Sequence, residues 1–266
     1  MNLQLGDKRV LVTGSSSGIG TGIAQYMADE GAQVVVHGRD SARTEAVAKE
    51  ITRKGGKAFA VIGDIATDKG ADAVAKAIND RIGGIDVLVN NVGGPGGPWT
   101  WDTTTIDQWA EQYQLNTLSG VRMIQRFLPG MKAQRFGRII QIASIAGVRP
   151  FPDQVPAYCA SKSATMVMMV SLAQTVAGTG VTANTLVPGF VATEGLQGYV
   201  LNSPGNEGKD WAKIEPEVAR GFRCAVGRLG TPTDVASMVA YLASPSSSWI
   251  TGSTFRIDGG TADWVG

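Results

Sequence analysis

The sequence has little of several residues that define other protein classes. Its 266 residues contain one histidine, His37, and two cysteines, Cys159 and Cys224. A single histidine argues against histidine-based catalysis and against histidine-rich metal sites, so no metal site is predicted. The cysteines lie 65 positions apart (224 − 159) without the spacing of a metal or redox motif. A disulfide framework is therefore not expected, and a reducing compartment fits the composition.

Charge of one sign and long apolar runs are missing as well. The chain has 24 Lys and Arg against 23 Asp and Glu, which leaves a net charge of +1. This balance provides neither a basic field for nucleic acid nor an acidic tail. No stretch approaches a membrane span, and residues 1–8 contain no apolar signal core. We therefore expect a cytoplasmic protein with no nucleic-acid partner and no membrane partner.

What the chain does have is a repeated alternation of short apolar runs with longer helical segments. Seven runs read as strands: Arg9–Thr13, Gln33–His37, Ala58–Ile62, Val87–Asn90, Arg138–Ala143, Thr182–Val187 and Thr254–Ile257. Continuous apolar runs are typical of a parallel sheet that is buried on both faces. Helices are predicted at about 18–30, 41–54, 68–82, 106–131, 156–177 and 232–243.

These repeated units predict an α/β architecture. The expected fold is a doubly wound Rossmann fold with a seven-stranded, mainly parallel sheet and ligands at the carboxyl ends of the strands. The chain has no linker of Pro, Ser and Gly and no internal repeat. We therefore predict a single domain over residues 1–266.

A glycine-rich loop follows the first predicted strand and opens directly into a helix. Gly14, Gly18 and Gly20 have the spacing G-x-x-x-G-x-G. Glycines let the backbone approach a pyrophosphate, and the helix N-terminus supplies N–H donors. A turn that serves packing alone is the alternative, but the position at the first βα turn favours dinucleotide binding. A second glycine-rich loop, 90–97, follows the fourth strand, and there a structural turn is the alternative.

Tyr158 and Lys162 lie four residues apart, a spacing that places both side chains on one face of a helix. A phenol with a pKa near ~10 is a poor acid-base catalyst at neutral pH. A neighbouring ammonium group favours the phenolate, so the pair can pass a proton to or from an alcohol oxygen. Taken alone, the spacing also fits two residues that merely share a helix face.

The motifs together resemble the short-chain dehydrogenase/reductase family, in particular its 3-oxoacyl reductase-like branch. The matching residues, in order, are Thr13-Gly14-x-x-x-Gly18-x-Gly20, Asp64, Asn90-Asn91-x-Gly93, Asn116, Ser144, Tyr158-x-x-x-Lys162, Pro188-Gly189-x-x-x-Thr193, Arg228-Leu229-Gly230 and Asp258-Gly259-Gly260. The resemblance covers nearly the whole chain and is specific for fold and reaction class. It says much less about the substrate.

The resemblance implies a catalytic set of four residues. Tyr158 would be the acid/base, and Lys162 would lower its pKa and bind the nicotinamide ribose. Ser144 would hold the substrate oxygen. Asn116 would hold a water that links Lys162 to solvent, although an asparagine within a helix also fits a local kink.

The resemblance likewise implies a dinucleotide-binding set, in which Asp64 contacts the adenine and Thr193 the nicotinamide carboxamide. The full set is Gly14, Ser15, Ser17, Gly18, Ile19, Gly20, Arg39, Asp64, Ile65, Asn91, Val92, Gly93, Tyr158, Lys162, Pro188, Gly189, Val191 and Thr193.

The choice between NADP and NAD is expected at the end of the second strand. An acidic residue there binds the ribose 2′-OH of NAD, whereas an arginine accommodates the 2′-phosphate of NADP. His37 occupies the expected acidic position and Arg39 follows it, so NADP(H) is favoured over NAD(H). The alternative is a surface arginine paired with Asp40. Ser17 stands where a second basic residue is often found.

Three variable segments carry the substrate information: 94–104, 145–155 and the 35 positions from Thr193 to Arg228 (228 − 193). The third is predicted to form a substrate lid at about 194–227. The tryptophans and phenylalanines of these segments favour an apolar or aromatic carbonyl compound.

We therefore expect an oxidoreductase that transfers a hydride between NADP(H) and a ketone or secondary alcohol. One alternative is a reductase of 3-oxoacyl thioesters carried by acyl carrier protein or coenzyme A. Gln174 and Thr179 stand where carrier-docking relatives have arginines, although Arg135 and Arg138 remain. The other alternative, a catalytically silent dinucleotide sensor, conflicts with the intact Tyr-x-x-x-Lys pair. The resemblance also implies a homotetramer that uses segments 156–177 and 232–257.

Overall fold

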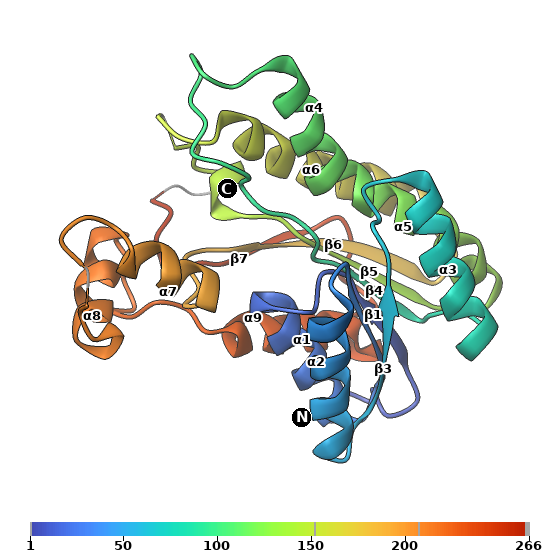
Figure 1. The fold of residues 1–266 in the computed structure, drawn as a ribbon. Helices are drawn as coiled ribbons and strands as arrows, with labels where there is room; N and C mark the ends of the chain where they lie inside the picture. Colours follow the sequence, from blue (N-terminus) through green and yellow to red (C-terminus); the bar gives the residue numbers. More distant parts are fainter. Residues whose placement is uncertain (1, 152, 207, 264–266) are drawn as a thin grey trace.

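The fold is a seven-stranded parallel sheet with helices on both faces (Figure 1). The structure is a computed structural model and describes residues 2–151, 153–206 and 208–263. The strand order is β3-β2-β1-β4-β5-β6-β7, and every neighbouring pair is parallel. The strands are β1 Arg9–Val12, β2 Gln33–Gly38, β3 Lys57–Ile62, β4 Val87–Asn90, β5 Gly137–Ile142, β6 Val181–Pro188 and β7 Thr254–Ile257.

Two layers of helices cover the sheet. One face carries α1, α2 and α9, and the other carries α3, α5 and α6 (Figure 1). Their bounds are α1 Gly18–Asp29, α2 Ser41–Arg53, α3 Asp68–Ile82, α4 Ile106–Tyr113, α5 Ser119–Ala133, α6 Pro156–Thr175, α7 Glu194–Leu201, α8 Trp211–Gly221 and α9 Pro232–Ala243. In the part of the chain that the structure describes, no helix is both long and apolar enough to cross a bilayer.

Alternation along the strands divides the apolar residues between two cores. Val10 and Val12 of β1 belong to the core under α1 and α9, whereas Leu11 belongs to the core under α3 and α5. All three side chains are fully buried. Each such side chain stabilises the fold by about 1.5–3 kcal/mol relative to an exposed position. The sequence shows continuous apolar strands because both faces of this sheet are buried.

The predicted fold class is confirmed, and each of the seven strands lies within one residue of its expected bounds at either end. The predicted helix 106–131 is wrong in its middle. It is interrupted by a π-turn over Gln114–Leu118, in which the Ser119 N–H donates to the carbonyl oxygen of Gln114, five residues back. Residues 194–227 contain the two helices α7 and α8, which the sequence did not resolve.

Side-chain caps begin the helices that lie around the strand ends. Thr105 and Gln108 form a capping box at α4. Thr231 accepts from the Asp234 N–H at α9, with Pro232 in the first turn. Such caps typically contribute about 1 kcal/mol each, so they fix where these helices start.

Candidate active site

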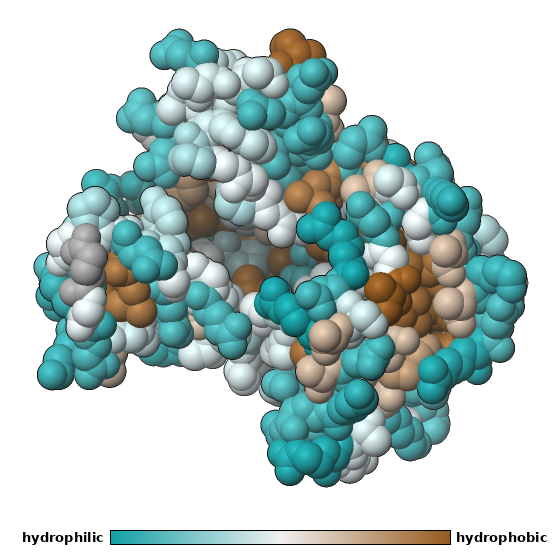
Figure 2. Space-filling view, in the orientation of Figure 1, coloured by the Kyte–Doolittle hydropathy of each residue, from teal (hydrophilic) through white to brown (hydrophobic). Residues whose placement is uncertain are grey.

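A cleft of about 590 Å³ runs along the carboxyl ends of the strands. The molecular surface is hollowed between α7 and α8 on one side and the ends of α4 and α6 on the other (Figure 2). Its lining joins five loops that lie far apart in the sequence: 14–20, 37–39, 63–65, 91–96 and 142–143, together with Tyr158, Lys162 and Thr193. Most of the residues expected to bind the dinucleotide therefore meet in one place.

The glycine-rich loop fits a phosphate-bearing ligand. Gly14 and Gly18 have φ values of +63° and +59°, a region that favours glycine. A Cβ atom on Gly20 would collide with the Gly14 carbonyl and with the Asn91 side chain. The Asn91 amide holds the loop by donating to the carbonyl oxygens of Thr13 (2.9 Å) and Gly14 (3.1 Å). Ser17 makes no side-chain cap at α1, which leaves the first N–H groups of that helix available to an anion.

The far end of the cleft is formed by Asp64, Ile65 and Val92. Asp64 is exposed, and its carboxylate accepts a hydrogen bond from the Ala66 N–H at 3.1 Å. Ile65 is buried beside it. This pairing of an apolar wall with a polar edge fits a flat heterocycle such as adenine.

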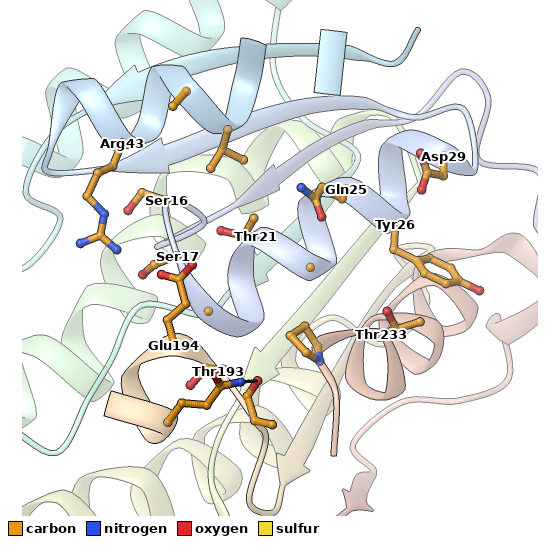
Figure 3. A pocket seen from close by; sticks show the side chains of 17 residues that line it. Ser16, Ser17, Thr21, Gln25, Tyr26, Asp29, Arg43, Thr193, Glu194 and Thr233 are labelled. Carbon is orange, nitrogen blue, oxygen red and sulfur yellow. Dashed lines mark hydrogen bonds between the residues drawn. The ribbon is translucent and has the colours of Figure 1, made fainter. Parts of the chain in front are cut away.

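Arg39 lies at the mouth of the cleft, and Asp40 does not neutralise it. The Asp40 carboxylate accepts the Arg43 N–H at 2.9 Å and so caps α2. Within the described residues, neither the Arg39 nor the Arg43 guanidinium forms an ion pair. Arg43 extends above Ser16 and Ser17 across an adjoining groove (Figure 3). The sequence reading missed Arg43, although its position four residues after Arg39 on the first turn of a capped helix is a usable signal.

The expectation for His37 was wrong. We expected its side chain at the position that selects between NAD and NADP, open to the ribose. The structure buries it to 1% exposure between the glycine-rich loop and the loop after β3. The next position, Gly38, has no room for a selecting side chain, because a Cβ atom there would collide with Thr44 and crowd Ser16.

Ser144 and Tyr158 meet at the other end of the cleft. Ser144 follows β5 and begins a short 3-10 helix, Ile145–Gly147, by accepting from the Ala146 N–H at 3.2 Å. Tyr158 lies in the first turn of α6. Burial raises the pKa of the Tyr158 phenol above its usual value, and a hydrogen bond with Ser144 opposes that rise. The two hydroxyl groups therefore form one unit that a carbonyl oxygen could join.

Lys162 is buried one helical turn after Tyr158. Its ammonium group donates to the carbonyl oxygen of Ile142 at 2.9 Å, and Nζ lies 5.9 Å from the centre of the Tyr158 ring. Burial lowers the pKa of Lys162 to about 8. The Tyr158 pKa, which we expected Lys162 to lower, is raised in this geometry, and burial of the phenol is the main cause.

Asn116 lies in the π-turn, and its side chain is hydrogen-bonded to neighbouring groups. Its amide donates to the Gly94 carbonyl (3.2 Å) and to the Gln112 side chain (2.9 Å), and its oxygen accepts the Gly94 N–H (2.8 Å). A Cβ atom on Gly93 would lie 2.5 Å from the Asn116 oxygen and 2.8 Å from Lys162 Nζ. Glycine at position 93 is thus what allows these two polar groups to approach each other.

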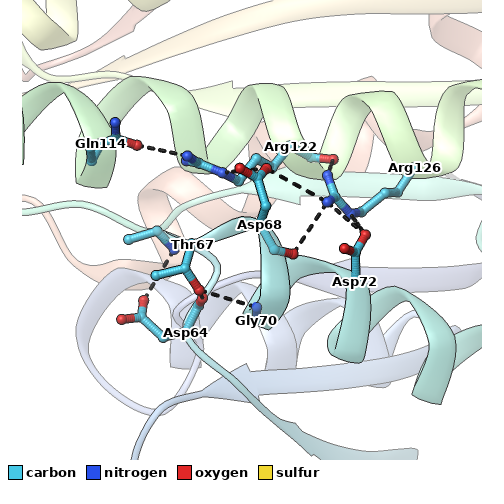
Figure 4. A network of polar contacts seen from close by, with 9 residues as sticks. Asp64, Thr67, Asp68, Gly70, Asp72, Gln114, Arg122 and Arg126 are labelled. Carbon is cyan, nitrogen blue, oxygen red and sulfur yellow. Dashed lines mark hydrogen bonds and ion pairs between the residues drawn. The ribbon is translucent and has the colours of Figure 1, made fainter.

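A polar network ties this turn to the start of α3 (Figure 4). Arg122 donates to the Gln114 side chain at 2.7 Å and to Asp68 at 3.0 Å, and Arg126 pairs with Asp72 at 2.7 Å. These contacts fix α5 against α3 and tie Gln114, the first residue of the π-turn, to Arg122 of α5.

Residues 188–193 form the remaining wall of the cleft. Gly189 packs so closely on Asp258 that a Cβ atom would lie 2.7 Å from the Asp258 backbone. Val191 forms a bridge with Gly230, and Thr193 caps α7 by accepting the Leu196 N–H at 3.3 Å. Thr193 lines the cleft, whereas Pro188, Gly189 and Val191, which were also expected to bind the dinucleotide, are not among the residues that line it.

Aromatic side chains connect the segments next to Ser144 and Tyr158. The rings of Phe190 and Phe222 are stacked, with centroids 3.7 Å apart and an interplanar angle of 4°. Phe151 packs on Phe190 at 6.1 Å. This stack links the loop after β5, the loop after β6 and the end of α8.

The entry to α6 has an unusual backbone. Val155, the residue before the helix, has φ 48° and ψ 46°, a left-handed conformation that is rare for a β-branched residue. Its N–H donates to the carbonyl oxygen of Trp99 at 2.7 Å. Two of the segments expected to contact the substrate, 94–104 and 145–155, are thereby joined directly beside the helix that carries Tyr158.

Comparisons with known proteins agree with this geometry. A family model described as short chain dehydrogenase matches residues 8–202. An uncharacterized oxidoreductase of Bacillus subtilis, YvrD, is 35% identical over 98% of both chains, as is a 3-oxoacyl-[acyl-carrier-protein] reductase of Vibrio cholerae. The crystal structure of L-sorbose reductase from Gluconobacter frateurii, complexed with NADPH and L-sorbose, covers all of both chains with a TM-score of 0.92 and 31% identity.

Proposed function

Since this chain belongs to the short-chain dehydrogenase/reductase family, we propose that it transfers a hydride between NADP(H) and a ketone or secondary alcohol. The observation that carries the proposal is a cleft that Tyr158 and Lys162 line together with the glycine-rich loop, with Ser144 hydrogen-bonded to Tyr158. In the proposed complex, the nicotinamide binds beside Tyr158.

Three side chains of the protein supply the proton for the substrate oxygen and stabilise the charge that its transfer leaves behind. When bound, the nicotinamide supplies a hydride to the carbonyl carbon, or accepts one from the alcohol. The Ser144 hydroxyl donates a hydrogen bond to the substrate oxygen and polarises the carbonyl group. Tyr158 then donates its proton to that oxygen, which completes the alcohol and leaves a phenolate. The Lys162 ammonium stabilises this phenolate by its charge, a role that fits its burial one turn away.

The route by which Tyr158 regains its proton involves the π-turn. The side-chain NH2 group of Asn116 already donates to Gly94 and Gln112, and its oxygen accepts the Gly94 N–H. We propose that the water that the family resemblance implies binds a backbone carbonyl of the π-turn, where the hydrogen-bond register is shifted by one residue.

Two arginines that form no ion pair with any described residue support a preference for NADP(H). Arg39 lines the cleft together with Ser16 and Ser17, and Arg43 lines the adjoining groove beside the same two serines (Figure 3 shows Arg43). A guanidinium pairs well with a phosphate, and such charge-assisted hydrogen bonds are about twice as strong as neutral ones. The NADPH complex of the L-sorbose reductase relative supports the same preference.

The substrate is proposed to be an apolar or aromatic carbonyl compound, enclosed by a lid formed from residues 194–227. The support is the aromatic stack of Phe151, Phe190 and Phe222, which connects the end of α8 to the loop after Ser144. Closure of α7 and α8 would cover the side chains of Ser144 and Tyr158 and exclude water from them.

A 3-oxoacyl thioester is the second candidate, because a reductase of such substrates is 35% identical to this chain. Docking of an acyl carrier protein has less support. Arg138 is buried and donates to the carbonyl oxygens of Gly180 (3.2 Å) and Ser244 (3.3 Å), and Arg135 donates to Gly178 (3.2 Å). These arginines hold the fold together, so a coenzyme A thioester is the better form of this candidate.

One experiment separates the candidates. Initial rates are measured with NADPH and with NADH against aryl ketones, a ketose such as L-sorbose, a 3-oxoacyl coenzyme A and the corresponding acyl carrier thioester. The proposal expects the highest kcat/KM for an apolar or aryl ketone with NADPH. Turnover confined to the thioesters would establish the second candidate, and binding of NADPH without turnover of any carbonyl would overturn both.

We also propose a cytoplasmic homotetramer. The outer face of α6 exposes Val167 and Val170, at 72% and 44%, on a helix whose opposite face is already buried in the core. An apolar stripe on the outside of a buried helix fits an interface between copies of the chain.

A further inference from the structure

The only histidine of the chain is placed between the two loops that form the adenosine end of the cleft. His37 Nδ1 accepts a hydrogen bond from the Gly14 N–H at 3.2 Å. On the other side of the ring, Nε2 lies 3.1 Å from the carbonyl oxygen of Gly63. Gly14 belongs to the glycine-rich loop after β1, and Gly63 directly precedes Asp64 and Ile65 after β3.

These two contacts determine the protonation state of the ring. Gly14 offers a hydrogen, so Nδ1 must carry a lone pair. Gly63 offers only an acceptor, so Nε2 must carry the hydrogen. The geometry is therefore that of a neutral imidazole in its Nε2–H tautomer, since an imidazolium could not accept from Gly14.

The backbone of His37 is anchored independently of the ring. The Ser15 N–H donates to the His37 carbonyl oxygen at 2.8 Å, and the His37 N–H donates to the Ser15 hydroxyl at 3.0 Å. Ser15 in turn donates to Val12 at 2.7 Å. The backbone hydrogen bonds of His37 do not reach the loop after β3. The ring does, because it contacts Gly14 of the glycine-rich loop on one side and Gly63 of the loop after β3 on the other.

We propose that His37 is a positioning residue of the dinucleotide site, whose neutral ring fixes the spacing between the Gly14 amide and the Gly63 carbonyl. This spacing sets the glycine-rich loop, which faces the pyrophosphate, against the wall that faces the adenine. The proposal rests on the binding of a nicotinamide dinucleotide and holds for any carbonyl substrate.

The surroundings keep the ring neutral. Burial is the main cause that lowers the pKa of His37 to about 4, and it outweighs the Gly63 carbonyl and the nearby Asp64, which both favour the charged form. Arg39, two residues on, carries a charge of the same sign as an imidazolium. Across the neutral pH range, the ring therefore acts as a fixed acceptor and donor and not as an acid-base group.

The first test observes the ring directly in the free protein. Because the chain has one histidine, ¹H–¹⁵N correlation spectra of the imidazole need no assignment. The expected result is the Nε2–H tautomer, with no titration between pH 5 and pH 8. An Nδ1–H tautomer, or titration near the ordinary histidine value, would overturn the proposal whatever the enzyme reduces.

The second test compares cofactor affinity with turnover. His37→Leu keeps an apolar filler but removes both hydrogen bonds, so the Kd for NADPH should rise on the order of 10-fold or more. At saturating NADPH, kcat should stay within about twofold. His37→Gln retains an amide that can accept and donate, so it should recover most of the affinity.

A matched control separates positioning from loss of stability. Val35→Ala removes buried volume from the same strand and the same face of the sheet, two residues before His37. It should lower the melting temperature without changing the Kd. Equal Kd values for wild type and His37→Leu, or equal losses in His37→Leu and Val35→Ala, would show that His37 only fills the core. If His37→Leu does not fold, the tautomer and titration still decide the question.

Discussion

The ammonium group of Lys162 is buried against a single acceptor, the carbonyl oxygen of Ile142, at 2.9 Å. No carboxylate among the described residues forms an ion pair with it. A buried cation without a counter-charge is held at a cost in folding free energy, and burial accordingly lowers its pKa from 10.5 to about 8. Such a cost is expected where a charge is kept for chemistry.

Lys162→Met should therefore stabilise the protein while it abolishes turnover. The pKa shift from 10.5 to about 8 corresponds to a destabilisation of the folded state by about 3 kcal/mol. In the variant, the Ile142 carbonyl loses its hydrogen bond, which costs about 1 kcal/mol or more. A net gain of about 1–2 kcal/mol in unfolding free energy at pH 7 is expected, measured by urea denaturation.

The same variant gives a pH dependence with a definite sign. Between pH 8 and pH 10.5 the unfolded wild type binds more protons at this lysine than the folded one, so wild-type stability rises with pH. The advantage of Lys162→Met should be full below pH 8 and shrink toward pH 10. An advantage that does not change across that window would mean that Lys162 is not the source of the cost.

Tyr158→Phe should reduce kcat by about 10²–10⁴-fold, because it removes the only proton donor proposed to touch the substrate oxygen. The Kd for NADPH, measured by fluorescence titration, should stay within a few-fold of wild type. Cys159→Ser, one residue on and buried away from the substrate oxygen, is the control for local disturbance of α6. A Tyr158→Phe enzyme with near-normal kcat would remove Tyr158 from its proposed role.

Arg39→Ala and Arg43→Ala should each weaken binding of NADPH by about 1.5–3 kcal/mol and leave NADH almost unchanged. The reason is that only NADPH carries the 2′-phosphate. Arg53→Ala is the matched control, because Arg53 lies at the other end of α2 and already pairs with Glu50 at 2.7 Å. Equal KM values for NADPH in wild type and in both variants would show that these arginines are surface charges, and NAD would then become the favoured cofactor.

Asp40→Ala tests whether Asp40 acts as a helix cap or as a partner of Arg39. Loss of the cap should lower stability by about 1 kcal/mol, while the ratio of KM values for NADPH and NADH stays within about threefold. Asp210→Ala removes the equivalent cap from α8 and provides the comparison. A tenfold gain in preference for NADPH would instead reveal that Asp40 repels the phosphate.

Val167→Asp should dissociate the assembly, because it places a charge on the exposed apolar face of α6. Light scattering at micromolar concentration should find a tetramer for wild type and a smaller species for the variant. Lys49→Ala makes the same change in net charge on α2 and should leave the mass unchanged. A wild-type monomer under these conditions would reject the interface.

The sequence determined the architecture because its signals are local and repeated. Apolar runs of four to six residues that end in glycine-rich loops define buried parallel strands, and the side-chain caps at Thr105 and Thr231 mark where helices begin. The π-turn around Asn116 could not be found in this way. Its residues have ordinary helix propensities, and the register shift follows from the tertiary contacts that Asn116 makes with Gly94.

The sequence predicted the helical part of the site better than the residues at the strand ends. Tyr158 and Lys162 share a helix face, so their separation in sequence fixes their separation in space. The direction of a side chain at the end of a strand is not fixed in that way. His37 was expected at the position that selects the cofactor and is buried instead, whereas Arg43, which no motif marks, lies beside Ser16 and Ser17 of the glycine-rich loop (Figure 3).

The hydrogen bond between Val155 and Trp99 bears on how new substrate ranges could evolve or be engineered. The left-handed backbone of Val155 is held by a carbonyl group in the other loop. If only one of the two loops is replaced by that of a relative, this carbonyl group and the Val155 N–H need no longer lie in the positions that allow the hydrogen bond. Chimeras that exchange residues 94–104 alone should misplace the entry to α6 and lose activity toward every substrate. Exchange of 94–104 and 145–155 as a pair should preserve activity. The two loops therefore have to change together when substrate specificity changes.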